Sequence, residues 1–362
     1  MKRFNIEVLI GTLVLLLACA LLLSACGASR GTSGQDSEPA VETEGQAVEE
    51  AAAGVPETPP VIKRVVGLEP LEILQVESGP KSVELMPGGQ RIFVNDLYAH
   101  KVFIFNALDY GLEKTVALSD EPVEADFTEE GRLAWVSLYN SGKVVVVDTE
   151  AGEVVGEVAT GAMPKEVTVS PDSRWVYVSN WNSNTVTVID AARREAVKQL
   201  PMYGTPRGIC FSPEGDRAYI CVMGGNTLAE VDVDGGHEII RQIPCGTNPR
   251  HVVTSPGGET LYVSNNVAGT ITVVDRLAGS IAAVIPVGNK PRTIAITPDG
   301  GTLFVCNYDD GTVGSVDLRE LVQTFTISVF RPIGMAVSAE GDRLFVSQYA
   351  PPQVAVFKIV TE

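Results

Sequence analysis

Positively charged side chains recur at one position of a repeating pattern in this 362-residue sequence. Each of them directly follows a proline that returns at nearly constant intervals: Lys81, Lys165, Arg207, Arg250 and Arg292. Ammonium and guanidinium groups gathered around one opening would bind a carboxylate or a phosphate-bearing ligand. The alternative is that they pair with carboxylates of the same chain, such as Glu124 and Glu166. The pattern therefore predicts a ring of positive charge, interrupted at Val123 and Ile333, as a candidate anion site.

Two of the three histidines also occupy positions suited to chemistry. His251 follows Arg250, and His100 lies in a loop of an earlier copy of the repeat. If both faced one opening near Glu124 or Glu166, they could form a metal or acid–base site. A single hydrogen-bonded histidine is the simpler interpretation, because the sequence shows no histidine cluster and no Ser-His-Asp order. No catalytic residue is assigned, and the presence of a metal stays open.

A second set of side chains recurs where the repeat turns between its second and third runs, and it combines aromatic rings with amides: Tyr139, Asn180, Trp181, Tyr308 and Tyr349. If the repeats surround one opening, this turn and the segment that enters each repeat lie on the same face of the ring. A shallow rim of this kind would contact a glycan, a peptide or a partner loop. The amides could instead satisfy the backbone of the turn, as the recurrence of Asn with the repeat suggests.

The repeating unit is clearest from Pro164 to Thr205. It holds alternating or β-branched runs separated by turn residues, which is typical of four short antiparallel strands. Pro171 presets the first turn, and Asp190 ends the third strand, where its carboxylate can accept hydrogen bonds from the next backbone N–H groups. The sequence therefore predicts one four-stranded sheet per repeat.

The leading prolines of the repeats are Pro80, Pro122, Pro164, Pro206, Pro249, Pro291 and Pro332. Their steps of 42, 42, 42, 43, 42 and 41 residues are typical of propeller blades. The last repeat holds only three strands, and the segment from Leu74 to Pro80 matches the end of another repeat. We therefore expect an all-β, seven-bladed propeller whose ring is closed by an N-terminal strand that completes the last blade.

Several repeats carry the sequence Tyr-Val-Ser-Asn or a close variant, followed by a Thr-Val-Thr-Val-Ile-Asp-like run: Tyr177 to Asn180, Tyr262 to Asn265, Phe304 to Asn307 and Phe345 to Gln348. These motifs resemble the YVTN β-propeller repeat family, and the resemblance covers Leu71 to the C-terminus. Proteins of this family include surface-layer proteins, lactonases, haem-binding domains and dehydrogenase subunits. The resemblance therefore implies the fold and leaves the function open.

Residues 1–25 combine a positive start with an almost wholly apolar run from Val8 to Leu23. The sequence Leu23-Ser-Ala-Cys26 resembles the lipobox of bacterial lipoproteins, which implies cleavage before Cys26 and lipidation of that cysteine. The alternative is an uncleaved membrane anchor. We therefore expect a protein that is exported and lipid-anchored to the cell membrane or outer membrane, facing the periplasm or the cell exterior.

The next segment, residues 26–62, is rich in Ser, Gly, Ala, Glu and Pro and has almost no aliphatic pattern. Such a composition is typical of an extended acidic tether that holds residues 63–362, the expected propeller, away from the bilayer. The net charge of −18 argues against nucleic-acid binding, for which a basic surface is expected. The expected partners are the membrane, through the lipid, and an envelope protein, a glycan or a small anionic ligand; the propeller itself should be monomeric.

Four cysteines follow the lipobox: Cys210, Cys221, Cys245 and Cys306. Cys210 and Cys221 lie on neighbouring predicted strands, so a disulfide is conceivable in an exported protein, although small buried thiols fit their positions as well. A Cys-x-x-Cys-His motif is absent, which excludes covalently attached c-type haem. No cofactor is expected.

Three functions are compatible with these features. A non-enzymatic binding scaffold at the cell envelope fits the regular repeats and the lack of a complete catalytic set. A lactonase-like hydrolase or lyase would need carboxylates and a histidine converging on the channel mouth. A haem- or redox-associated propeller would need a ligand for the haem iron in the channel, and His251 is the obvious candidate.

Overall fold

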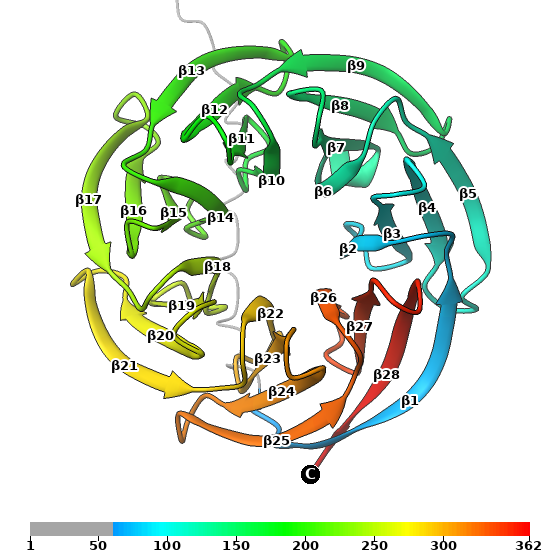
Figure 1. Cartoon of the computed structure of the whole chain (residues 1–362), viewed down its shortest axis with the longest axis vertical. Coiled ribbons are helices and arrows are strands. Elements are labelled where there is room, and N and C mark those ends of the chain that lie inside the picture. Colours follow the sequence, from blue (N-terminus) through cyan, green and yellow to red (C-terminus); the bar gives the residue numbers. More distant parts are fainter. Residues whose placement is uncertain (1–60) are drawn as a thin grey trace, which may run out of the picture. The chain divides into compact units, whose positions relative to one another are not determined.

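The computed structural model describes residues 61–362. The expected signal peptide, Cys26 and the tether up to residue 60 lie outside the described residues. The described part forms seven four-stranded sheets arranged in a ring around a central channel, which Figure 1 shows along the channel axis. This confirms the predicted all-β, seven-bladed propeller. Within this part of the chain, no helix is long and apolar enough to cross a membrane.

The strands of each blade follow one another outward from the channel. The innermost strands are β2 (Pro80–Leu85), β6 (Pro122–Thr128), β10 (Pro164–Val169), β14 (Thr205–Phe211), β18 (Pro249–Thr254), β22 (Pro291–Ile296) and β26 (Pro332–Val337). The second strands are β3 (Arg91–Asp96), β7 (Leu133–Leu138), β11 (Trp175–Asn180), β15 (Arg217–Met223), β19 (Thr260–Asn265), β23 (Thr302–Asn307) and β27 (Arg343–Gln348). We number the blades 1 to 7 in this order.

The third strands are β4 (Lys101–Asn106), β8 (Lys143–Asp148), β12 (Thr185–Asp190), β16 (Thr227–Asp232), β20 (Thr270–Asp275), β24 (Thr312–Asp317) and β28 (Gln353–Thr361). The outermost strands are β5 (Leu112–Ala117), β9 (Glu153–Ala159), β13 (Glu195–Pro201), β17 (Glu238–Pro244), β21 (Ser280–Pro286), β25 (Val322–Ser328) and β1 (Val65–Gln75). A short 3₁₀ helix, η1 (Glu129–Gly131), connects β6 to β7.

The turns within the blades follow from the recurring turn residues. The carboxylate of Asp148 accepts hydrogen bonds from the backbone N–H groups of Glu150 and Ala151, at 3.0 and 2.9 Å. In the turn that joins β14 to β15, Gly215 has a φ of 77°, a conformation that glycine adopts without a steric penalty. These local preferences hold each hairpin in register and so place the innermost strands at the channel.

The ring is closed by the first strand, as predicted. β1 pairs antiparallel with β28, and Leu74 lies opposite Val354. The strand begins at Val65, so the closing pair is longer than the match from Leu74 to Pro80 indicates. Blade 7 thus contains both ends of the described chain, and the paired strands cover an edge that would otherwise expose backbone groups.

Apolar side chains fill the space between neighbouring blades. Between blades 1 and 2, the rings of Phe93 and Phe127 pack edge to face with centroids 5.3 Å apart. Trp135 is fully buried, and its indole N–H donates a hydrogen bond to Thr128 Oγ1 at 3.1 Å. Close packing of this kind fixes the angle between blades and therefore the width of the channel.

The four described cysteines are free thiols: Cys210, Cys221, Cys245 and Cys306. In the β14–β15 pair Cys210 lies opposite Tyr219, so Cys221 is displaced along the strand from its expected partner. Cys210 and Cys221 are therefore small, largely buried thiols and do not form the disulfide that the sequence left open.

Candidate functional site

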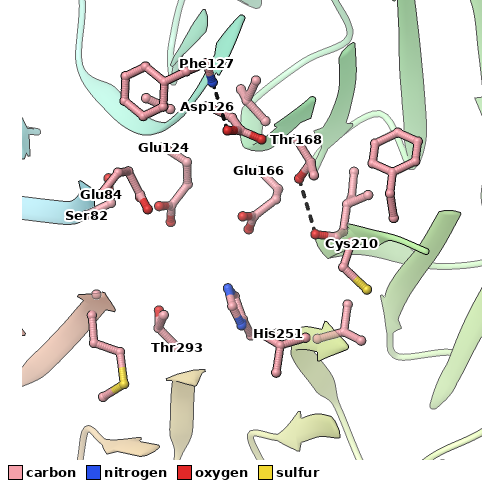
Figure 2. Close-up of a pocket in the computed structure, with 18 of the residues that line it drawn as sticks. Ser82, Glu84, Glu124, Asp126, Phe127, Glu166, Thr168, Cys210, His251 and Thr293 are labelled. Carbon is pink, nitrogen blue, oxygen red and sulfur yellow. Dashed lines mark hydrogen bonds between the residues drawn. The ribbon is translucent and has the colours of Figure 1, made fainter. Parts of the chain in front are cut away.

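The innermost strands line a cavity of about 400 Å³ in the channel. Its polar lining consists of Ser82, Glu84, Glu124, Asp126, Glu166, Thr168, Cys210, His251, Thr254 and Thr293. Figure 2 shows that the carboxylates gather on one side of the cavity, on β2, β6 and β10, and that His251 extends toward them from β18. Five basic residues directly follow leading prolines and so lie near the start of the innermost strands: Lys81, Lys165, Arg207, Arg250 and Arg292. We call this end of the channel the basic mouth.

Two of the basic residues belong to a buried chain of ion pairs. Lys81 Nζ lies 2.9 Å from Glu124 Oε1, and Arg207 contacts the same oxygen at 3.0 Å. A second nitrogen of Arg207 lies 2.7 Å from Glu166 Oε2. This ion chain joins four blades, because Lys81 and Glu124 come from blades 1 and 2 and Glu166 and Arg207 from blades 3 and 4. For Lys81 and Arg207 the structure therefore supports pairing within the protein over binding an external anion.

Burial and the paired charges act in opposite directions within the ion chain. Burial by itself would raise the pKa of Glu124, but Lys81 and Arg207 outweigh it and hold that pKa below its usual range. Burial lowers the pKa of Lys81 to about 8, although Glu124 favours the ammonium form. The carboxylate of Glu124 is therefore the central negative charge of the ion chain.

The other carboxylates of the cavity are shifted in the opposite direction. Burial, with a further contribution from Glu124, raises the pKa of Glu166 and of Glu84. Burial also raises the pKa of Asp126 to about 6, although backbone N–H groups of Val169 and Phe127 donate to its carboxylate. Four carboxyl groups around one small cavity cannot all be ionised without a large electrostatic cost. The pKa values of Glu84, Glu166 and Asp126 are therefore raised, while Glu124 next to two cations stays ionised.

The remaining basic residues, Lys165, Arg250 and Arg292, have no carboxylate within ion-pairing distance among residues 61–362. Lys165 Nζ lies 3.7 Å from the ring centroid of Tyr139 and 4.9 Å from that of Trp181. The guanidinium of Arg292 lies 3.6 Å from the ring centroid of Tyr308, and its Nε is buried without a hydrogen-bond partner. These cations keep unused donors at the mouth.

Like charges make this cluster electrostatically unfavourable without a ligand. Burial, Arg207 and Arg292 lower the pKa of Arg250 well below its ordinary value. Burial, Arg207 and Lys81 lower the pKa of Lys165 to about 6. Contacts with aromatic faces oppose this effect, since each favours a cation by about 0.5–2 kcal/mol. Groups perturbed by burial and by charges of their own sign are typical of functional sites.

The predicted aromatic rim is part of the same cluster. Tyr139, Trp181 and Tyr308 contact the cations, and Tyr349 packs against Tyr98 with centroids 6.0 Å apart. The rings therefore cover the basic residues and do not form a separate surface.

Asn180 departs from the expected rim. Its side chain is fully buried and donates to Thr187 Oγ1 at 2.8 Å and to Thr185 Oγ1 at 3.1 Å. The equivalent Asn265 donates to Thr272 in the same way. The recurring amide ties the second strand to the third within a blade, and this structural role removes Asn180 from the candidate ligand contacts.

The histidines lie apart. His251 lines the cavity, its Nδ1 is buried without a hydrogen-bond partner, and burial lowers its pKa to about 4, so the ring is neutral near pH 7. His100 is exposed on the turn after β3 and does not line the cavity. Within residues 61–362 no group of three His, Cys, Asp or Glu side chains is arranged to hold a metal ion.

Three side chains were not singled out in the sequence. Glu84 and Asp126 occupy one position of the innermost strands, where other blades carry Cys210 or small and apolar residues. When the repeats are aligned, a carboxylate at a position that is mostly small or apolar in the other blades could have identified Glu84 and Asp126 as unusual. His237 lies between blades 3 and 4, where its Nδ1 is 2.7 Å from Tyr177 Oη, and it has a structural role. Nothing in its sequence context marks that contact.

Asp126 should make the stability of the propeller depend on pH. Its pKa rises from about 4 in the unfolded chain to about 6 in the folded one, so its stabilising effect is complete below pH 4 and is lost as the pH rises through 6. In the Asp126→Asn variant, the decrease in the free energy of unfolding between pH 4 and pH 7 should be about 2–3 kcal/mol smaller than in the parent protein. Urea unfolding of the parent protein and of Asp126→Asn near pH 4 and pH 7 measures this difference. Equal decreases in the two proteins would show that another group is responsible.

Comparison with known proteins supports the architecture. Residues 115–258, less than half of the chain, match the family model for YNCE-like beta-propellers, which are related to YVTN propellers. No curated protein sequence matches the chain. Among solved structures, a chain of hydrazine synthase from Kuenenia stuttgartiensis is similar, with a TM-score of 0.72 and 20% identity over 80% of this chain and 98% of that chain. At this identity the likeness shows the fold alone, and the comparisons place this chain among proteins of the β-propeller fold.

Proposed function

We propose that this protein is a lipid-anchored, extracytoplasmic β-propeller that binds a small anionic ligand at the basic mouth of its channel. The observation that carries the proposal is the cluster of Lys165, Arg250 and Arg292, which have no ion-pair partner among residues 61–362. A bound anion would offset the repulsion between these cations. The ligand would carry a carboxylate or a phosphate group, which guanidinium groups bind through paired hydrogen bonds.

The surroundings of the cluster favour a ligand over an accidental surface charge. The chain as a whole carries a net charge of −18. Three basic residues at one opening without ion-pair partners in the described chain are therefore not expected from the overall composition. The face of the Arg292 guanidinium lies against the ring of Tyr308, so its N–H groups at the edge remain free to donate hydrogen bonds to a ligand. The ion chain of Lys81, Glu124, Arg207 and Glu166 joins blades 1 to 4 at the same end of the strands and would keep the mouth in shape.

The location forms part of the same proposal. The lipobox-like Leu23-Ser-Ala-Cys26 and the acidic composition up to residue 62 support a tethered protein outside the cytoplasm. In this setting the propeller would present its mouth to solutes, glycans or other envelope proteins. Binding requires no cofactor.

A hydrolase or lyase active in the acidic cavity is a second candidate. His251 has an unpartnered ring nitrogen and extends toward Glu124 and Glu166, as Figure 2 shows. A neutral imidazole with a free ring nitrogen facing this cavity could act as a general base. Hydrolysis of lactone esters by the parent protein that is lost in His251→Ala would support the hydrolase function. Equal hydrolysis by the parent protein and His251→Ala would exclude it.

Calorimetry with lactate and with inorganic phosphate tests the proposed anion site. Arg250→Ala and Arg292→Ala should each weaken binding about 10- to 100-fold, because a hydrogen bond to a charged group contributes about 1.5–3 kcal/mol. Arg193→Ala is the matched control: Arg193 is an exposed arginine in the β12–β13 turn, where it pairs with Asp190. Unchanged affinity in both mouth variants, or no binding of either anion, would contradict the proposal.

A further inference from the structure

Lys165 differs in chemistry from the two arginines beside it. Its amine lies between the faces of Tyr139 and Trp181 and makes no hydrogen bond or ion pair with residues 61–362. Several other lysines of this region are paired with carboxylates, among them Lys81, Lys101, Lys143, Lys198 and Lys290. Lys165 is half-buried, so part of the residue remains in contact with solvent.

An amine in this setting is a nucleophile. Lysine side chains become reactive toward carbonyl groups when they are desolvated or lie near other cations, because both conditions favour the neutral form. Lys165 meets both conditions, since its side chain is partly buried and Arg207, Lys81 and Arg250 act on it with charges of its own sign. The lowering of its pKa to about 6 agrees with this geometry and leaves a large neutral fraction at pH 7.

The neighbouring guanidinium groups indicate what else the ligand carries. Arg250 and Arg292 follow the leading prolines of blades 5 and 6, as Lys165 does in blade 3, so the three side chains start from equivalent positions around one opening. A planar guanidinium binds a carboxylate through two parallel hydrogen bonds. A small molecule that satisfies both chemistries has a carbonyl group next to a carboxylate.

We propose that Lys165 forms an imine with a 2-oxo acid whose carboxylate is bound by Arg250 and Arg292; this inference rests on the proposed anion site. The Nζ lone pair attacks the carbonyl carbon, and one proton moves from the nitrogen to the carbonyl oxygen to give a carbinolamine. The hydroxyl group and the remaining proton on the nitrogen then leave as water, and the carbon–oxygen bond is replaced by a carbon–nitrogen double bond. One ligand carbonyl and one amine thus yield one imine and one water, with no oxidant or reductant.

Reductive trapping tests the imine. The protein is incubated with pyruvate and sodium cyanoborohydride, digested, and mapped by mass spectrometry, with Lys143 and Lys198 as surface lysines for comparison. We expect a single reduced pyruvate adduct on Lys165, formed at least about tenfold faster than on either comparison lysine. Lys165→Met should abolish that adduct, and Arg250→Ala should slow its formation about 10- to 100-fold.

Lactate separates failure of the imine from failure of the anion site, because it has the carboxylate of pyruvate and lacks the carbonyl. Calorimetric binding of lactate together with an adduct confined to Lys165 would support the inference. Binding of lactate without such an adduct, or adducts spread evenly over the surface lysines, would overturn the imine and leave the anion site standing. If neither lactate nor pyruvate binds, both proposals fail.

Discussion

Replacing Glu124 by glutamine should lower the free energy of unfolding by about 3–5 kcal/mol, the cost of leaving buried charges without a partner. Glu124 accepts from Lys81 and Arg207 at 2.9 and 3.0 Å, and the three side chains are almost completely buried. Glutamine keeps the size of the side chain and removes its charge. Chemical denaturation at pH 7 measures the loss.

Two further variants make the result specific to the ion chain. Glu157→Gln removes an exposed carboxylate that pairs with Lys143, and it should cost less than about 1 kcal/mol. Lys81→Met, added to Glu124→Gln, should recover part of the loss because it removes the buried cation that has lost its ion-pair partner, whereas Arg207 keeps Glu166. Similar losses for Glu124→Gln and Glu157→Gln would show that the channel charges are solvated and that the ion chain contributes little.

Replacing Leu74 by alanine should lower the free energy of unfolding by about 2–5 kcal/mol, as for other fully buried leucines. Leu74 is 2% exposed in the closing strand β1 and packs against blade 7 and blade 1. Its loss would open a cavity where the first strand joins the last blade. Thermal and urea unfolding of the two proteins measure the difference.

The control for this change lies on the same strand. Leu71 is 48% exposed, so Leu71→Ala should stay within about 0.5 kcal/mol of the parent protein. If both variants proved equally mild, β1 would not be a stabilising part of the ring, and closure would depend on contacts between blades 1 and 7 alone. If both were severe, strand pairing and not burial would decide the effect.

The fold was predictable because its determinants are local and repeated. Each blade has a proline at or next to the start of the innermost strand, and β-branched residues recur in its strands. In five of the seven blades an aspartate ends the third strand. The register within a blade follows from these turns, and the period near 42 residues indicates how many blades there are. The closing strand was predictable for the same reason, since Leu74 to Pro80 repeats the pattern that ends another blade.

The candidate site was predictable in outline only. The position after each leading proline predicts a basic ring that includes Lys165, Arg250 and Arg292. The carboxylates Glu124 and Glu166 were expected as alternative partners of such a ring, and both pair with Arg207. Which basic residues those carboxylates would neutralise depends on side chains reaching between blades. Arg207 reaches Glu124 from a residue 83 positions away, a separation that no local pattern encodes.

The sequence by itself thus determined the blade, the number of blades and the way the ring closes, because hydrogen bonding and turn geometry act over short distances along the chain. Only the tertiary structure decided how charge is shared around the channel. There, burial and the approach of separate strands pair Lys81 and Arg207 with Glu124, leave Lys165, Arg250 and Arg292 without ion-pair partners in the described chain, and raise the pKa of Asp126.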